Sequence, residues 1–306
     1  MSQPSPEQLL QRLEWKVIRR LDGLLQGDYR TLFRGFGLDL ADLREYQFGD
    51  DVRHIDWNVT ARTQVPHVRE HHEDREVTAW FLLDLSPSVD FGSEEVSKRQ
   101  ALIELTALLA RLLTRNGNKV GAMFFGAEVD GVTPPRGGRR HVLHLVNALM
   151  ARPALERSTP TDLAGVLRSA AGVIRKRSLV FLISDFISAP GWDGALGLLA
   201  RRHEVLAVRL LDPLELRLPE LGILLMKDAE TGETLFVDTQ DRGFRRRFAR
   251  AAEARQAELR DIFERAGVDA LELSTDDDVG DAILSFAQLR RARGRAARDD
   301  AARLAG

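Results

Sequence analysis

The sequence predicts an α/β protein with a doubly wound, mostly parallel β-sheet and helices on both faces. From residue 77 onward, strand-length apolar segments alternate with segments of helical periodicity, an order typical of parallel sheets. The strand-like segments at 77–83 and 179–183 are apolar throughout, as expected for strands that are covered on both faces. Each of these two segments runs into an aspartate, which indicates polar chemistry at the carboxyl edge of the sheet.

The N-terminal part of the chain has a different character. Residues 7–26 carry apolar side chains at the spacing of one helical face, and this helix is expected to end near Gly27. The charge-dense segment 34–62 shows neither helical nor strand periodicity. Loops of such length are uncommon in compact domains unless they serve a function.

The core is predicted to be built from a regular series of elements. The first are strand 77–84, helix 95–115, strand 119–125, a hairpin partner at 129–133, and helices 139–150 and 162–174. They are followed by strand 179–183, helix 192–201, strand 205–210, a hairpin of 223–226 with 234–237, helix 242–266, strand 269–273 and helix 280–292.

We therefore divide the chain into three parts. Residues 1–75 form an N-terminal helix and an extended segment, residues 76–292 form the α/β domain with its hairpin near 222–238, and residues 293–306 form a frayed tail.

The composition is that of a globular protein, with 44% hydrophobic and 29% charged residues among 306. A formal net charge of −2 provides no general attraction to nucleic acid or to an anionic membrane. The absence of cysteine excludes disulfides, thiolate metal sites and cysteine nucleophiles. No apolar segment approaches the roughly 18 residues of a membrane span, and the N-terminus lacks the pattern of a signal peptide. We expect a cytoplasmic protein without a membrane span or a nucleic-acid partner.

A candidate metal site lies at the predicted carboxyl edge of the sheet. Asp84, Ser86 and Ser88 follow the first apolar strand, Asp185 follows the second, and Thr161 precedes a helix between them. Because the carboxyl ends of parallel strands meet at one crevice, these side chains are expected to converge. An all-oxygen set of ligands suits a hard divalent cation, Mg²⁺ or Mn²⁺.

The hydroxyls of this set are the expected direct ligands. Ser86, Ser88 and Thr161 are neutral and carry free lone pairs, whereas Asp84 and Asp185 would accept hydrogen bonds from metal-bound water. The cation would then be only partly neutralised by its direct ligands. It would attract a carboxylate from another protein.

A purely structural interpretation remains open for each segment. An aspartate at a strand end often accepts backbone N–H groups in a turn. Thr159 could cap a helix that starts at Pro160, with Asp162 as the partner in a capping box. Asp-x-Ser-x-Ser alone is more often structural than functional, and it is the combination with the second strand that favours a site.

The combination resembles a known arrangement. Asp84, Ser86, Ser88, Thr161 and Asp185 stand in the order of the metal-ion-dependent adhesion site of von Willebrand factor type A domains. The segment from 42 to 62, Asp-Leu-Arg-Glu-Tyr-Gln-Phe-Gly-Asp-Asp-Val-Arg-His-Ile-Asp-Trp-Asn-Val-Thr-Ala-Arg, resembles the signature of the bacterial domain of unknown function 58. One residue departs from the pattern, since Phe186 stands where many type A domains have glycine.

The resemblance implies an adaptor rather than an enzyme. Members of this family resemble partners of MoxR-type AAA+ ATPases, which are thought to act in the assembly or maturation of other proteins. An acidic residue of a client or of the ATPase would then complete the coordination of the Mg²⁺.

The segment with the family signature also holds a candidate partner-binding group, Arg53, Asp56, Trp57 and Arg62. The two arginines could bind carboxylates of the core or of a partner. Trp57 fits either a core anchor or an interface residue, and we favour the core anchor.

Two other classes of function were considered. A magnesium-dependent phosphohydrolase or phosphotransferase would use Asp84 as its nucleophile. Against it, Ser86 stands where a second carboxylate would be needed, and the sequence shows no suitably placed lysine near Asp185. The arginine clusters at 136–140 and 245–247 could bind nucleic acid, which the net charge disfavours. No phosphate-binding loop is present, so we do not expect ATP hydrolysis by this chain.

Overall fold

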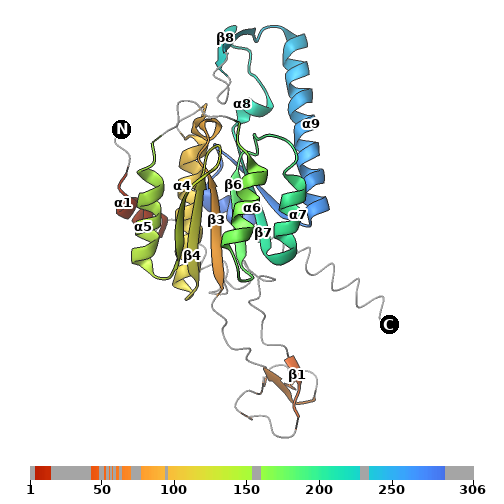
Figure 1. The fold of residues 1–306 in the computed structure, drawn as a ribbon. Coiled ribbons are helices and arrows are strands. Elements are labelled where there is room, and N and C mark those ends of the chain that lie inside the picture. The colour runs from red at the N-terminus through yellow and green to blue at the C-terminus, as the bar shows by residue number, and fades with distance from the viewer. Residues whose placement is uncertain are drawn as a thin grey trace.

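The computed structural model describes residues 4–14, 43–47, 64–69, 77–93, 96–153, 160–227 and 234–286, together with the single residues 52, 55, 57, 60 and 61. A six-stranded sheet forms its centre, in the order β10-β7-β6-β3-β4-β5 (Figure 1). The strands are β3 (Thr78–Asp84), β4 (Lys119–Phe125), β5 (Val129–Arg136), β6 (Leu179–Ser184), β7 (Glu204–Leu211) and β10 (Asp269–Ser274). Within this sheet β5 pairs antiparallel with β4, and the other neighbours are parallel.

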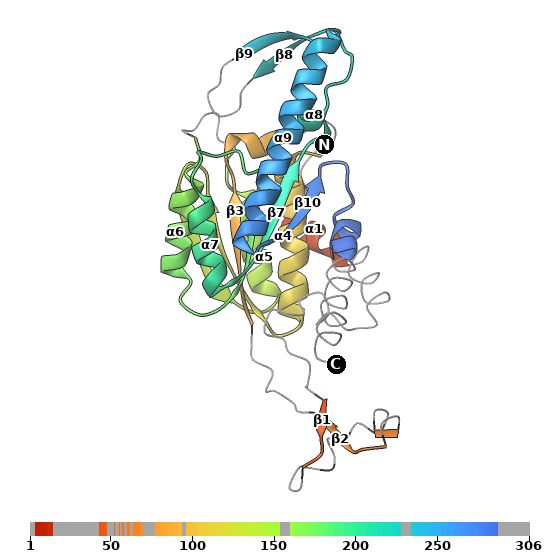
Figure 2. The same cartoon turned by 90° about the vertical axis from the view of Figure 1, so that its right-hand side faces the viewer.

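Helices cover both faces of the sheet (Figures 1 and 2). On one face lie α1 (Pro6–Leu13), α4 (Lys98–Arg115), α5 (Arg139–Met150) and the helical residues 279–286, which share one apolar core. On the other face lie α6 (Leu163–Val173), α7 (Asp193–Arg202) and the C-terminal part of α9 (Arg242–Ala266), which share a second core. The predicted fold class, a mostly parallel sheet with helices on both faces, is confirmed.

The register of the central strands brings the predicted site together. In β3, Leu83 pairs with Ile183 of the parallel strand β6, so Asp84 lies level with Ser184. All of β3 from Ala79 to Asp84 is buried, because the strand has apolar neighbours on both faces of the sheet. The carboxyl ends of β3 and β6 therefore meet at one edge.

The predicted elements agree with the observed ones to within a few residues, with some differences at their ends. The described part of the N-terminal helix ends at Leu13, and residues 15–26 lie outside the described part. The helix expected from 162 begins at Leu163 with Asp162 as its N-cap, whose carboxylate accepts the N–H of Gly165 at 2.8 Å. The alternative in which Thr159 caps this helix is therefore wrong.

Several short elements were not predicted. They are the 3₁₀ turn η4 (Pro87–Asp90), the four-residue helix α8 (Pro213–Leu216), and the paired strands β1 (Leu43–Glu45) and β2 (His67–Arg69). The hairpin expected near 222–238 is present as β8 (Ile223–Lys227) and β9 (Thr234–Asp238).

Of the four candidate partner-binding residues, the structure describes one, Trp57. Trp57 is 69% exposed, so the interpretation as a core anchor is wrong and the interface interpretation remains. Arg53, Asp56 and Arg62 lie outside the described residues, as does the tail 293–306. The division of the chain at residue 75 stays a prediction. Among the described residues, no helix combines the length and the apolar character that crossing a membrane requires.

Candidate metal centre

Asp84 is held at the end of β3 by two hydrogen bonds. Its Oδ1 accepts the N–H of Ser86 at 2.9 Å, and its Oδ2 accepts the hydroxyl of Ser184, which precedes Asp185 on β6. The side chain is fully buried. These bonds fix the carboxylate across the two central strands. The bond from the N–H of Ser86 is the turn contact that the structural interpretation expects.

The two serines after β3 lie on a tight turn. Ser86 occupies the N-cap position of η4, yet its hydroxyl makes no capping hydrogen bond there. Instead, its Oγ lies 3.1 Å from the Oγ of Ser88, and both residues are buried. The turn therefore pairs two hydroxyls beside Asp84.

Thr161 brings a buried hydroxyl that has no hydrogen-bond partner in the described structure. Since Asp162 caps α6, the hydroxyl of Thr161 is not used as a cap. The loop is tied down through its backbone, because the N–H of Ala189 donates to the carbonyl of Thr161 at 3.1 Å. Buried hydroxyls are usually paired, so this hydroxyl is available to a ligand.

Asp185 is placed by an unusual backbone at the next residue. Phe186 has a φ of 59°, in the left-handed region that glycine adopts most easily. Its buried ring packs against Trp192 and Phe263, with centroids 5.5 and 5.0 Å away. This packing explains how Phe186 holds a backbone conformation that favours glycine. The loop keeps its shape, and the Oδ1 of Asp185 accepts the N–H of Ile187 at 3.0 Å.

A lysine lies beside Asp185, contrary to the sequence-based expectation. The Nζ of Lys98 donates to the Oδ2 of Asp185 at 2.7 Å and to Glu215 of α8 at 2.6 Å, and its side chain is fully buried. Lys98 is the first residue of α4, immediately after the N-cap Ser97. A cation at a helix N-terminus opposes the helix dipole. The position of Lys98 at the start of a helix was therefore the one indication in the sequence that carboxylates lie near its ammonium group.

The electrostatics of the centre are those of a crowded acidic cluster. Burial, and secondarily the charge of Asp185, raises the pKa of Asp84 to about 7, although the hydrogen bonds from Ser184 and Ser86 act in the opposite direction. Burial alone would lower the pKa of Lys98, but the carboxylates of Asp185 and Glu215 raise it above its ordinary value. The ammonium group of Lys98 thus compensates Asp185 and Glu215, and a further cation near Asp84 would favour the ionised form of its carboxyl group.

The residues present fit Mg²⁺ or Mn²⁺. Two paired serine hydroxyls, the unpaired hydroxyl of Thr161 and the carboxylates of Asp84 and Asp185 form an all-oxygen set. Within the part of the chain that the structure describes, His, Cys, Asp and Glu side chains nowhere gather in threes or more as a metal-binding cluster. A centre on this edge would therefore depend on hydroxyls.

Comparisons with known proteins identify relatives of this chain. Residues 42–258 match the family described as "Protein of unknown function DUF58". An uncharacterized protein of Mycobacterium tuberculosis is 36% identical over 282 residues, which cover 92% of this chain and 89% of that protein. The family resemblance inferred from the segment 42–62 is thereby confirmed.

Solved structures show more distant likenesses. An aerotolerance-related membrane protein from Bacteroides fragilis is 15% identical with a TM-score of 0.49, covering 69% of this chain and 97% of that one. The von Willebrand type A domain of SpRpn10 is 12% identical with a TM-score of 0.37, covering 68% of this chain and 94% of that one.

Proposed function

The chain belongs to the DUF58 family, and we propose that it is a non-enzymatic adaptor that binds an acidic residue of a partner protein through Mg²⁺ or Mn²⁺. One observation carries the proposal. The unpaired, buried hydroxyl of Thr161 lies at the same sheet edge as two paired serine hydroxyls and two aspartates. The unpaired hydroxyl and the neutral oxygens of the serines together favour a bound cation over a structural turn.

The residues have distinct roles in this proposal. Ser86, Ser88 and Thr161 would hold the ion directly, and Asp84 and Asp185 would accept hydrogen bonds from its water ligands. When bound, the ion would supply a positive charge that attracts a carboxylate. The chain's own contribution is to keep the oxygens fixed, as the hydrogen bonds from Ser86 and Ser184 to Asp84 do.

The partner is proposed from the family resemblance. A MoxR-type AAA+ ATPase, or a client protein that it helps to assemble or mature, would supply the acidic residue. A cytoplasmic location belongs to the same proposal.

Calorimetric titration of the metal-free protein with Mg²⁺ and Mn²⁺ tests the metal centre. We expect single-site binding in the wild type, and weaker or absent binding in Thr161→Val and Asp84→Ala. Thr106→Val is the matched control, because Thr106 is also buried with an unpaired hydroxyl but lies within α4, about two turns from its start. If the wild type releases no heat and shows no thermal stabilisation by either metal, the metal centre is rejected.

Co-purification tests the partner. A MoxR-type ATPase is expected to remain bound to the wild type in Mg²⁺, and to be released by chelator or by Asp84→Ala. Binding that survives both treatments would contradict metal-dependent recognition, even if the titration shows a metal.

One observation favours a second candidate, the phosphohydrolase or phosphotransferase. Lys98 lies beside Asp185, which removes one of the objections raised from the sequence. The other objection remains, since Ser86 stands where a second carboxylate would be needed. The structure adds two more: both oxygens of Asp84 accept hydrogen bonds, and its raised pKa weakens it as a nucleophile at neutral pH. Hydrolysis of generic phosphoesters that is lost in Asp84→Asn would establish this alternative.

A further inference from the structure

The β8–β9 ribbon carries an exposed apolar face. Leu225 lies directly opposite Phe236 in the pairing of the two strands, and Ile223 is two residues away on the same face. These three side chains are 59%, 75% and 73% exposed. Leu221 at the base and Leu235 on the other face are also exposed. Contiguous exposed apolar residues of this kind usually mark a binding surface.

The ribbon is fixed at its base. The N–H and the hydroxyl of Thr239 both donate to the carbonyl of Gly222, at 2.8 and 2.7 Å, and the N–H of Leu221 donates to the Thr239 hydroxyl at 2.9 Å. A guanidinium nitrogen of Arg245 on α9 donates to the carbonyl of Thr239. The β8–β9 ribbon is thus held out beyond the sheet, beside the N-terminal part of α9 (Figure 2).

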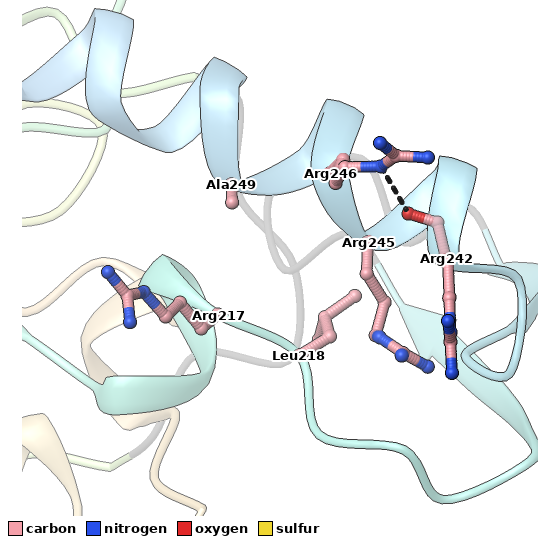
Figure 3. Close-up of a pocket in the computed structure, with 6 residues that line it drawn as sticks. All are labelled: Arg217, Leu218, Arg242, Arg245, Arg246 and Ala249. Carbon is pink, nitrogen blue, oxygen red and sulfur yellow. Dashed lines mark hydrogen bonds between the residues drawn. The ribbon is translucent and has the colours of Figure 1, made fainter.

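A basic pocket of about 520 Å³ adjoins this base (Figure 3). It is lined by Arg217 and Leu218, which follow α8, and by Arg242, Arg245, Arg246 and Ala249 of α9. Among the described residues, one ion pair reaches these four arginines, between Arg245 and the largely exposed Glu220 at 3.3 Å. The pocket therefore has an excess of positive charge in a protein whose net charge is −2.

The two features specify one kind of occupant. Carboxylates complement the arginines, and apolar side chains complement the face formed by Ile223, Leu225 and Phe236. In the described part of the chain the ribbon pairs with no third strand, so an extended peptide could add to its edge. We propose that the ribbon and the pocket together form a docking surface for an extended segment of a partner protein in which acidic and apolar residues alternate.

This surface is separate from the metal centre. Its residues come from α9, the ribbon and the segment after α8, and it requires no metal ion. The two lie at the same edge of the molecule, since Glu215 of α8 contacts Lys98 and Arg217 follows two residues later. The docking proposal can therefore hold or fail independently of the proposed metal-dependent function.

Fluorescence anisotropy in the presence of chelator tests the docking surface. The probe is a short labelled peptide in which Glu alternates with Leu and Val, compared with the same peptide carrying Lys in place of Glu. We expect the acidic peptide to bind preferentially and its affinity to fall as salt rises. The double variant Arg242→Ala, Arg246→Ala is expected to weaken binding by about tenfold or more, and Leu225→Ser, Phe236→Ser by a similar factor.

Matched controls separate the surface from general effects. Arg260→Ala removes an exposed arginine of α9 outside the pocket, and Leu198→Ser removes an apolar side chain of α7 that is 60% exposed. Neither should change binding by more than about twofold.

Three results would overturn the proposal. The first is equal binding, or no binding, of the acidic and basic peptides at low salt. The second is an oligonucleotide that binds more tightly than the acidic peptide and is unaffected by the ribbon variant, which would make the pocket a nucleic-acid site. The third is concentration-dependent dimerisation in sedimentation that Phe236→Ser abolishes, which would make a second copy of this chain the occupant.

Discussion

The buried ammonium group of Lys98 compensates Asp185 and Glu215 in the metal-free protein. The contact of Lys98 with Asp185 could not be predicted from the sequence. Loss of one partner from a buried ion pair leaves an uncompensated charge, which costs far more than the pair itself contributes. The proposed metal ion would share Asp185 with this ammonium group, so each positive charge should reduce the need for the other.

The first prediction concerns this compensation. Lys98→Met keeps much of the side-chain volume but removes the charge, and we expect it to lower the free energy of unfolding of the metal-free protein by about 3 kcal/mol. Saturating Mg²⁺ should restore a larger share of stability in Lys98→Met than in the wild type. Urea unfolding with and without Mg²⁺ measures both effects, with Lys176→Met as the exposed control. An unchanged midpoint in Lys98→Met would show that the ammonium does not compensate the cluster.

Asp84 yields a pH-dependent prediction. Its pKa is about 7 in the folded metal-free protein and about 3.9 in the unfolded chain. Between these values the folded state binds a proton that the unfolded state does not, so its stabilising contribution is complete below about pH 3.9 and is lost as the pH rises through about 7.

Asp84→Asn cannot ionise, so it should lose this pH dependence. In chelator, the stability of the variant relative to the wild type should increase by about 2 kcal/mol between about pH 5.5 and pH 8. Urea unfolding at both pH values tests this, because the difference between the two proteins cancels the other titrating groups. A constant difference across this range would contradict a raised pKa at Asp84.

At the scale of elements, the hydrophobic pattern of the sequence was sufficient to predict the bounds of the long segments. Helices 139–150 and 242–266 have the predicted bounds because each shows several repeats of the helical period, and strand 119–125 has them because it is a short, mostly apolar segment that ends at a turn. The turn at Pro87–Asp90 and the helix at Pro213–Leu216 are too short to display a period, and they hold Ser88 and Glu215 of the centre. The sequence thus predicted that the carboxyl ends of β3 and β6 meet at one edge, and the ligand role of the five candidate residues stays a prediction. The contact of Lys98 with Glu215 could not be predicted, because α8 is too short to show a period.

The loop after β6 shows how two elements fix a ligand. Phe186 joins this loop to Trp192 at the start of α7 and to Phe263 on α9 through their rings. Phe186→Gly would relieve about 1 kcal/mol of backbone strain but would lose ring packing typically worth about 3–5 kcal/mol. We expect a net loss of about 2–4 kcal/mol in urea unfolding.

The same variant separates stability from metal binding. The contacts of Asp185 with Lys98 and with the N–H of Ile187 do not involve the Phe186 ring, so calorimetry should still detect Mg²⁺ in Phe186→Gly. Higher stability in the variant than in the wild type would mean that the strain outweighs the packing.

At the scale of the whole molecule, Asp212 connects several segments at the carboxyl edge of the sheet through hydrogen bonds. Its buried carboxylate accepts the N–H and the hydroxyl of Ser93 after β3, the N–H of Leu214 in α8, and the hydroxyl of Thr275 after β10, at 2.6–2.9 Å. Burial would raise the pKa of Asp212, but the hydrogen bonds from Ser93, Leu214 and Thr275 hold it below the ordinary value. Its stabilising contribution is therefore present above the unfolded pKa of about 3.9 and is lost as the pH falls through the lower folded value.

Asp212 therefore connects segments that carry both proposed surfaces, since Glu215 of the centre and Arg217 of the pocket follow it closely. Asp212→Ala leaves several donors unpaired, and we expect it to lower the free energy of unfolding by about 2–4 kcal/mol at neutral pH. The exposed Asp261→Ala on α9 should change it by less than about 0.5 kcal/mol. Because the loops on either side of the centre lose their common acceptor, Mg²⁺ and the acidic peptide should both bind more weakly to Asp212→Ala, in calorimetry and anisotropy respectively. If the variant loses stability while both affinities stay at the wild-type values, Asp212 supports the fold alone and the two surfaces are positioned without it.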